Sequence, residues 1–204
     1  MASEQQIVLG VLTEVHRDSA ATQRQIAGNL GIALGMANAY LKRCVKKGLV
    51  KVTQAPANRY LYYLTPAGFA EKTALTADYL SQSFDFFRTA RSHCAEILAQ
   101  ADSRGWRRMA LVGASELAEI MALCAAGTGI EMVGIVDAGA AGRHLAGLPV
   151  AATLAELPAA DGVAVTALKG AQDLYDRLAG EIGAQHLLIP ALLGVHVQQP
   201  ATTV

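Results

Sequence analysis

The chain has 204 residues, of which 52% are apolar and 17% are charged, and its formal net charge at pH 7 is zero. This length allows one large domain or two small ones, and the apolar content excludes a chain that is disordered throughout. No apolar run reaches the roughly 18–20 residues of a membrane span, and the first residues lack the basic start and apolar core of a signal peptide. We therefore expect a soluble, cytoplasmic protein without a membrane partner.

The zero net charge conceals a gradient along the chain. Residues 1–65, the basic segment, contain eight Lys or Arg and three Asp or Glu. Residues 108–204, the acidic segment, contain four Lys or Arg and nine Asp or Glu. This distribution indicates that only the basic segment meets a polyanion such as double-stranded DNA.

The basic segment predicts a helix over residues 4–18 and then two short helices separated by a glycine. Thr22 is a suitable N-cap for the first short helix, and Gly31 follows it where a sharp turn needs a positive φ. The second short helix begins near Ala33 and ends at Gly48. Two helices joined by a glycine turn are typical of a helix-turn-helix.

Two strand-like runs follow, LVKVTQ at 49–54 and RYLYYLT at 59–65, and Pro56 and Asn58 between them predict a turn. A hairpin at this place is a wing. With YLYYLTPAGFAEKTALTADYL at 60–80, residues 5–95 resemble winged helix-turn-helix regulators of the MarR type, in particular the exopolysaccharide-associated MarR-like group. The sequence departs from the pattern at Ala33, where Ser or Thr often caps the second helix, which removes about 1 kcal/mol of capping.

The resemblance implies that the second helix enters the major groove of double-stranded DNA. Asn38 would then pair with adenine through its amide, and Arg59 on the wing would reach a phosphate or a narrow minor groove. Basic residues alone would be an ordinary solvated face, and some winged helices bind protein instead, so that alternative stays open. The residues expected to contact DNA are Thr22, Gln23, Arg24, Leu34, Gly35, Asn38, Lys42, Arg43 and Arg59.

A long helix is predicted from Pro66 to about Ser103, because neither Gly nor Pro occurs between Gly68 and Ser103. Its apolar stripe comprises Leu80, Phe84, Phe86, Phe87, Cys94, Ile97 and Leu98. The stripe either packs against the chain's own domains or forms the seam of a homodimer through residues 67–105. We favour the dimer, since two-fold DNA-binding proteins place two heads about one helical turn of DNA apart.

The acidic segment alternates apolar strand-like runs, at 109–114, 131–137, 162–168 and 186–195, with helical stretches. This order predicts an open, Rossmann-like parallel sheet and an α/β fold overall. The run VGIVDAGAAGRHLAGLPVAATLAEL at 133–157 resembles Rossmann domains of the redox-sensing repressor Rex, and CoA-binding domains and nucleotide-sugar-modifying enzymes carry a similar run. The predicted organisation is a winged helix-turn-helix at 1–66, a linker or dimerisation helix at 67–105, a ligand-sensing domain at 106–196 and a flexible tail at 197–204.

The turn after the first of these strands is GASELA, where a dinucleotide site would have three glycines. Gly113 keeps the first glycine, Ser115 replaces the second, and Glu116 puts a negative charge near the expected phosphate. Asp137 lies near the usual distance for an acid that binds ribose. We weigh a ligand site and an empty scaffold equally. The candidate ligand-binding residues are Gly113, Ala114, Ser115, Glu116, Leu117, Asp137, Thr166, Lys169 and Gly170.

No catalytic or metal-binding constellation is evident in the sequence. GASEL is not the GxSxG nucleophile elbow, the histidines are dispersed, and Cys44, Cys94 and Cys124 lie far apart, as free thiols in a reducing compartment do. The favoured function is a non-enzymatic, sequence-specific transcriptional regulator that senses a nucleotide-type metabolite, with NAD(H) as one candidate. The alternatives are a nucleotide- or nucleotide-sugar-dependent enzyme and a ligand-free scaffold for dimerisation or docking.

Overall fold

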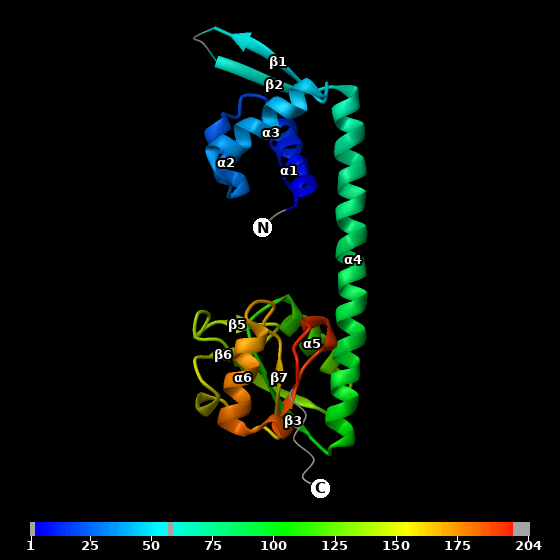
Figure 1. Cartoon of the computed structure of the whole chain (residues 1–204), viewed down its shortest axis with the longest axis vertical. Coiled ribbons are helices and arrows are strands. Elements are labelled where there is room, and N and C mark those ends of the chain that lie inside the picture. The colour runs from blue at the N-terminus through cyan, green and yellow to red at the C-terminus, as the bar shows by residue number, and fades with distance from the viewer. Residues whose placement is uncertain (1–2, 57–58, 198–204) are drawn as a thin grey trace. The chain divides into compact units, whose positions relative to one another are not determined.

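The computed structural model describes residues 3–56 and 59–197 (Figure 1). Asn58 of the predicted wing turn and residues 198–204 of the predicted tail lie outside this part of the chain. The chain divides into two compact units, the head (Met1–Phe84) and the body (Asp85–Val204). Over the described residues, no helix combines the length and apolar character needed to cross a membrane.

The head is a winged helix-turn-helix, as the sequence predicts. Its elements are α1 (Glu4–Arg17), α2 (Gln23–Leu30), α3 (Leu34–Lys46) and an antiparallel hairpin of β1 (Val50–Ala55) and β2 (Arg59–Leu64). Ser3 and Thr22 each form a capping box at the start of α1 and α2, and Gly31 takes the left-handed conformation, with φ 62°, at the end of α2. Ala33 gives α3 no side-chain cap, also as predicted.

The long helix α4 (Pro66–Ser103) begins against the base of the wing. The Thr65 hydroxyl donates to the carbonyl of Gly48 at 2.6 Å and accepts from the amide of Gly68 at 3.0 Å. A Cβ atom on Gly68 would lie 2.0 Å from the carbonyl oxygen of Leu49. The threonine and glycine of the LTPAG motif therefore fix where the helix leaves the wing.

The body is an α/β unit built on a mainly parallel sheet. Its strands are β3 (Arg108–Val112), β4 (Glu131–Val136), β5 (His144–Leu145), β6 (Leu148–Ala151), β7 (Gly162–Val165) and β8 (Leu187–Leu188). They lie in the order β5-β6-β4-β3-β7-β8, and β5 alone is antiparallel to its neighbour. Its helices are α5 (Glu116–Ala125), α6 (Ala171–Ile182) and the short 3-10 helices η1 (Leu154–Glu156), η2 (Ala184–His186) and η3 (Ala191–Leu193). The predicted fold class is confirmed, while the β5–β6 hairpin was not predicted.

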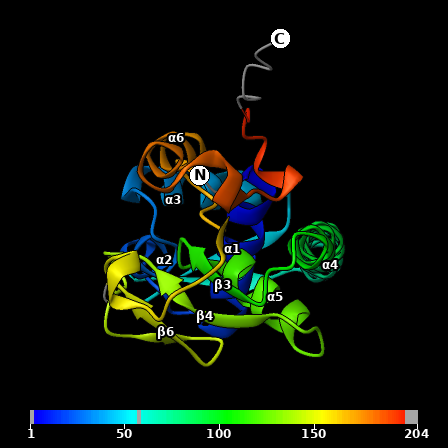
Figure 2. The ribbon, with the colours of Figure 1, turned by 90° about the horizontal axis from the view of Figure 1, so that it is seen from below.

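Both faces of this sheet are covered. Alternate residues of β3 point to opposite sides, so Met109 and Leu111 join a cluster with α5 and α4, whereas Ala110 and Val112 join a cluster with α6. Figure 2 looks along α4 and shows α5 beside it, with α6 apart from both.

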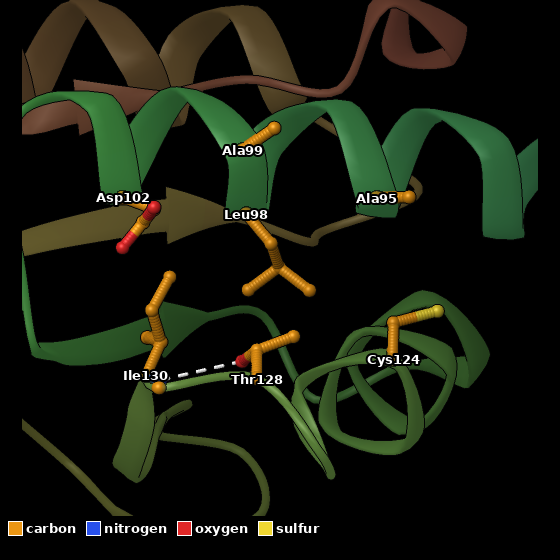
Figure 3. Close-up of a pocket in the computed structure, with 8 residues that line it drawn as sticks. Ala95, Leu98, Ala99, Asp102, Cys124, Thr128 and Ile130 are labelled. Carbon is orange, nitrogen blue, oxygen red and sulfur yellow. Dashed lines mark hydrogen bonds between the residues drawn. The ribbon is translucent and has the colours of Figure 1, made fainter.

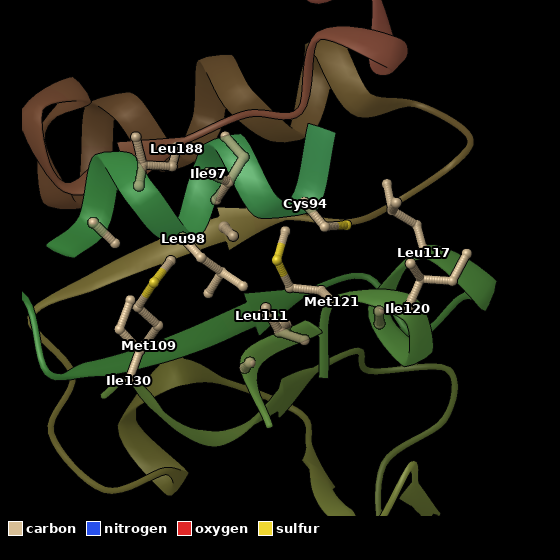
Figure 4. Packing of buried hydrophobic residues seen from close by; sticks show 14 of the residues in the cluster. Cys94, Ile97, Leu98, Met109, Leu111, Leu117, Ile120, Met121, Ile130 and Leu188 are labelled. Carbon is tan, nitrogen blue, oxygen red and sulfur yellow. The ribbon is translucent and has the colours of Figure 1, made fainter. Parts of the chain in front are cut away.

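The C-terminal part of α4 belongs to the core of the body, and the structure corrects our expectation for this part of the helix. Figure 4 shows Cys94, Ile97 and Leu98 of α4 over Met109 and Met121. Cys94 is fully buried, and Ile97 and Leu98 are 2% and 4% exposed. These side chains are buried in the core of a single chain, so they cannot form the interface of a homodimer. The large apolar side chains of α4 that stay exposed are Phe69, Tyr79, Leu80, Phe84, Phe86 and Phe87.

Candidate functional site

The helix α3 presents one face to the core of the head and another to solvent. Ala37, Leu41 and Cys44 are buried, whereas Leu34 and Lys42 on the other face are exposed. Burial of the first three at intervals of three and four residues fixes the rotation of α3 about its axis. The predicted DNA-contacting face of α3 is therefore free of protein contacts over much of its length.

A groove of about 320 Å³ separates α3 from the wing and brings together three of the predicted DNA-contacting residues, Gln23, Asn38 and Lys42. Tyr60 and Tyr62, two residues apart on β2, line the same groove. Sequence reasoning did not select these tyrosines, although the period of two in RYLYYL places both on one face of the strand. The Gln23 amide donates to the Tyr62 hydroxyl at 3.3 Å, so this glutamine links α2 to the wing.

Asn38 lies half-buried in this groove, and its carbonyl oxygen Oδ1 is covered without a hydrogen-bond partner among the described residues. A bidentate contact with adenine needs this oxygen as the acceptor and the amide nitrogen as the donor. Pairing with a base therefore requires the Asn38 side chain to rotate. A buried acceptor without a donor is unfavourable, so an incoming donor would relieve that cost.

The other predicted DNA-contacting residues differ in how free they are. Leu34, Gly35, Arg24 and Arg59 are exposed. The Thr22 hydroxyl is engaged with Gln25 in the capping box. Arg43 forms an exposed ion pair with Glu4 of α1 at 2.5 Å, and such a pair contributes at most about 1 kcal/mol.

In the body, the turn between β3 and α5 packs against another loop of the same chain. Gly113 has φ 105°, and a Cβ atom there would lie 2.5 Å from the backbone of Ala167 in the loop after β7. The glycine therefore makes room for a neighbouring loop of the same chain. In a dinucleotide site, glycines of this turn would make room for a pyrophosphate.

Ser115 is the N-cap of α5 and also joins this helix to Thr166, the residue that follows β7. Its hydroxyl accepts from the amides of Leu117 at 3.2 Å and Ala118 at 3.4 Å, and it donates to the carbonyl of Thr166 at 2.6 Å. The hydroxyl of Thr166, which is fully buried, donates to the carbonyl of Gly113 at 2.7 Å. Two of the amides that would face a phosphate at this helix terminus are thus already hydrogen-bonded to the Ser115 hydroxyl.

Asp137, the predicted ribose-binding acid, is bound to two backbone amides. Its Oδ2 accepts from Ala114 at 2.9 Å and its Oδ1 accepts from Gly139 at 2.9 Å. The carboxylate therefore holds the β3–α5 loop against the loop after β4. The structure brings together Gly113, Ala114, Ser115, Asp137 and Thr166. Their polar groups form hydrogen bonds with one another.

Lys169 and Gly170 stand apart from this hydrogen-bonded cluster. Gly170 precedes α6 in the left-handed conformation, and Lys169 is exposed. A groove of about 290 Å³ begins at the other side of the cluster, at Ser115. It is lined by Ala114, Ser115, Glu116, Glu119, Ala140, Arg143, His144, Leu145 and Val150. Arg143 and His144 were not among the predicted ligand-binding residues, because the β5–β6 hairpin that places them was not expected.

A second groove of the body, of about 380 Å³, lies between α4 and α5 (Figure 3). Leu98 and Ile130 face each other across it, and Cys124 closes one end. Burial raises the pKa of Cys124 and raises that of the nearby Cys94 to about 12, so both thiols stay protonated and unreactive at neutral pH. Over the described part of the chain, no three His, Cys, Asp or Glu side chains are placed to bind a metal ion.

Comparisons with known proteins bear on the head. Residues 5–51 match the family described as winged helix-turn-helix DNA-binding. Among solved structures, MepR, a transcription regulator of the Staphylococcus aureus multidrug efflux pump MepA, is 22% identical, with a TM-score of 0.33 over 38% of this chain and 61% of MepR. The PcaV transcriptional regulator from Streptomyces coelicolor is 20% identical, with a TM-score of 0.38 over 43% of this chain and 62% of PcaV.

The S. aureus MepR–DNA complex is 25% identical, with a TM-score of 0.34 over 41% of this chain and 62% of MepR. This chain therefore spans about three fifths of the length of each of these regulators. No curated protein sequence matches the chain significantly. The family match agrees with the structure, in which residues 5–51 contain the helix-turn-helix and the start of the wing.

Proposed function

We propose that the protein is a DNA-binding transcriptional regulator of the MarR type. The observation that carries this proposal is the exposed, basic face of α3 beside an open groove under the wing, in a segment that matches a DNA-binding family. A helix of 13 residues is of a size that the major groove accepts. The hairpin beside it then reaches the flanking backbone or minor groove.

Within this proposal the head contacts DNA in two ways. Lys42, Arg24 and Arg59 are exposed and form no ion pair with another described residue, so they are free to neutralise phosphates. Asn38, after rotation, supplies base discrimination. Arg43 is already paired with Glu4, so it adds less to DNA affinity than its charge suggests.

A homodimer through the middle of α4 is part of the proposal. Phe84 is 59% exposed, and Phe86 and Phe87 are each 42% exposed. Large apolar side chains that cluster in the open on one helix mark an interaction site. A second copy would cover them and would supply the second head that a two-fold operator needs.

The experiment that tests DNA binding is a salt series on operator DNA. Each phosphate contact adds about 0.9 to the slope of log K against log salt. We expect Lys42→Gln to lower the slope by about one unit, whereas Arg43→Gln, its paired neighbour on α3, changes it less. An affinity that does not vary with salt would refute the proposal.

We further propose that the body senses a small metabolite, which the sequence predicts to be of the nucleotide type. The groove beside Ser115, at the carboxyl ends of β3 and β4, supports an effector site, since open α/β sheets bind ligands at this edge. The mutual hydrogen bonds of Ser115, Asp137 and Thr166 favour the second candidate, a ligand-free scaffold. Stabilisation of the body by AMP or NAD(H) would support the nucleotide, because a ligand at 100 times its Kd adds about 2.7 kcal/mol.

A further inference from the structure

The groove beside Ser115 carries charges of both signs that are not paired with one another. Arg143 and His144 lie on its β5–β6 side, and Glu116 and Glu119 lie on its α5 side. None of the four forms an ion pair or side-chain hydrogen bond with another described residue. The guanidinium of Arg143 and the two carboxylates therefore line one groove without pairing with one another.

Both sides of this groove are held in place by the backbone. The carbonyl of Arg143 accepts from the amide of Val150 at 2.9 Å, and His144 pairs with Pro149 in the hairpin. On the other side, the Ser115 cap fixes the first turn of α5, which carries Glu116 and Glu119. The charged groups thus start from fixed main-chain positions, which lowers the entropy cost of binding a ligand.

The charge pattern distinguishes between ligand classes. Glu116 and Glu119 repel a phosphate at the α5 side, and the Ser115 hydroxyl already occupies the amides of Leu117 and Ala118. An anionic group is instead favoured at Arg143, one of only four Lys or Arg in the acidic segment. An ammonium group is favoured beside the two glutamates. A ligand that bears both charges satisfies both sides at once.

The size of the groove suits a small ligand. Its volume of about 290 Å³ is close to the lower end of the range of roughly 300–1,000 Å³ found for ligand clefts. Ala140, Leu145 and Val150 supply an apolar lining between the charged sides. We propose that this groove binds a small zwitterion of the α-amino acid class, with its carboxylate on Arg143 and its ammonium on Glu116 and Glu119.

This inference rests on the proposed sensing role of the body, but it replaces the nucleotide expected from the sequence with a small zwitterion. It is tested without DNA, so its failure leaves the DNA-binding proposal untouched. The probes are the standard free L-amino acids at millimolar concentration, together with AMP and NAD⁺, and binding to the full chain is measured by calorimetry. We expect at least one free amino acid to bind and the nucleotides to bind more weakly.

The best amino acid is then compared with its N-acetyl and carboxamide derivatives, which each remove one charge. Arg143→Gln should weaken binding of the amino acid about tenfold or more, since a charge-assisted contact is lost, while leaving affinity for the carboxamide nearly unchanged. Glu116→Gln with Glu119→Gln should do the same for the ammonium, measured against the N-acetyl form. The matched controls are Arg177→Gln and Glu181→Gln on α6, both exposed and outside the groove.

Three results would overturn the proposal. The first is that no free amino acid binds. The second is that the acetylated or amidated derivative binds as tightly as the free amino acid, because the pairing of both charges would then be irrelevant. The third is that AMP or NAD⁺ binds and amino acids do not, which would support nucleotide sensing instead.

Discussion

Replacing Ser115 with alanine tests whether the turn after β3 is closed by the protein itself. The change removes the acceptor for the amides of Leu117 and Ala118 and the donor to the carbonyl of Thr166. Loss of a serine cap costs about 0.5–2 kcal/mol, and loss of the 2.6 Å bond to Thr166 costs a further 0.5–1.5 kcal/mol or so. We therefore expect the free energy of unfolding of the body to fall by about 2 kcal/mol.

The assay is urea unfolding of the full chain followed by the fluorescence of Trp106. This residue is the only tryptophan of the sequence and belongs to the core of the body, where it is 9% exposed, so its signal follows the body without the head. With a urea dependence of about 2 kcal/mol per molar, the midpoint should move down by about 1 M.

Two further substitutions separate the contributions of the hydroxyl. Ser115→Asp keeps an acceptor for the helix amides but cannot donate to Thr166, so its loss should be smaller than that of alanine. Ser115→Thr keeps both functions and should stay within about 0.5 kcal/mol of the original chain. If Ser115→Ala itself changed stability by less than about 0.5 kcal/mol, the self-capped turn would be refuted.

Four other substitutions address the backbone and the pH dependence. Ala146 has φ 49° in the two-residue β5–β6 turn, and Ala146→Asn creates the favoured Asn-Gly pair. It should raise the free energy of unfolding reported by Trp106 by up to about 1 kcal/mol, and an unchanged or lower value would contradict the strain. Gly68→Ala should lower the free energy of unfolding of the head by about 1–3 kcal/mol, because its Cβ atom would clash with the backbone of Leu49. Gly28→Ala, where a Cβ atom meets open space, should instead stabilise α2. Both are measured by circular dichroism, and equal effects would contradict the close approach at Gly68. The amides of Arg107 and Arg108 donate to Asp161 and lower the pKa of that carboxyl below 3.8, so its stabilising effect is present above pH 3.8 and lost as the pH falls through the folded-state pKa. Asp161→Asn should therefore lower the urea midpoint at pH 7 and differ less from the original chain in acid; a constant difference would contradict the shift.

The local features of the head could be predicted from the sequence because each depends on neighbouring residues. Thr22 caps α2 through Gln25, three residues later, and Gly31 ends that helix because glycine accepts a positive φ. Pro66 begins α4 because the first turn of a helix does not need the N–H group that proline lacks. The alternation of apolar runs with helical stretches likewise predicted the parallel sheet of the body.

Contacts between distant residues decided the rest. The stripe on α4 revealed an apolar face, but only the folded body showed that Cys94, Ile97 and Leu98 pack on its own sheet. The same limit applies to the candidate sites: the space beside Gly113 is filled by Ala167, which is far away in the sequence.

The charged groove of the body also depends on tertiary structure. Arg143 and His144 are brought to α5 by a two-residue strand pairing too short to have a periodic pattern. The sequence by itself determined which segments form helices and strands, because hydrophobic period, caps and turn residues act over a few residues. Only the tertiary structure decided which polar groups are already satisfied and which are free for a ligand, because hydrogen-bond partners are chosen by position in space.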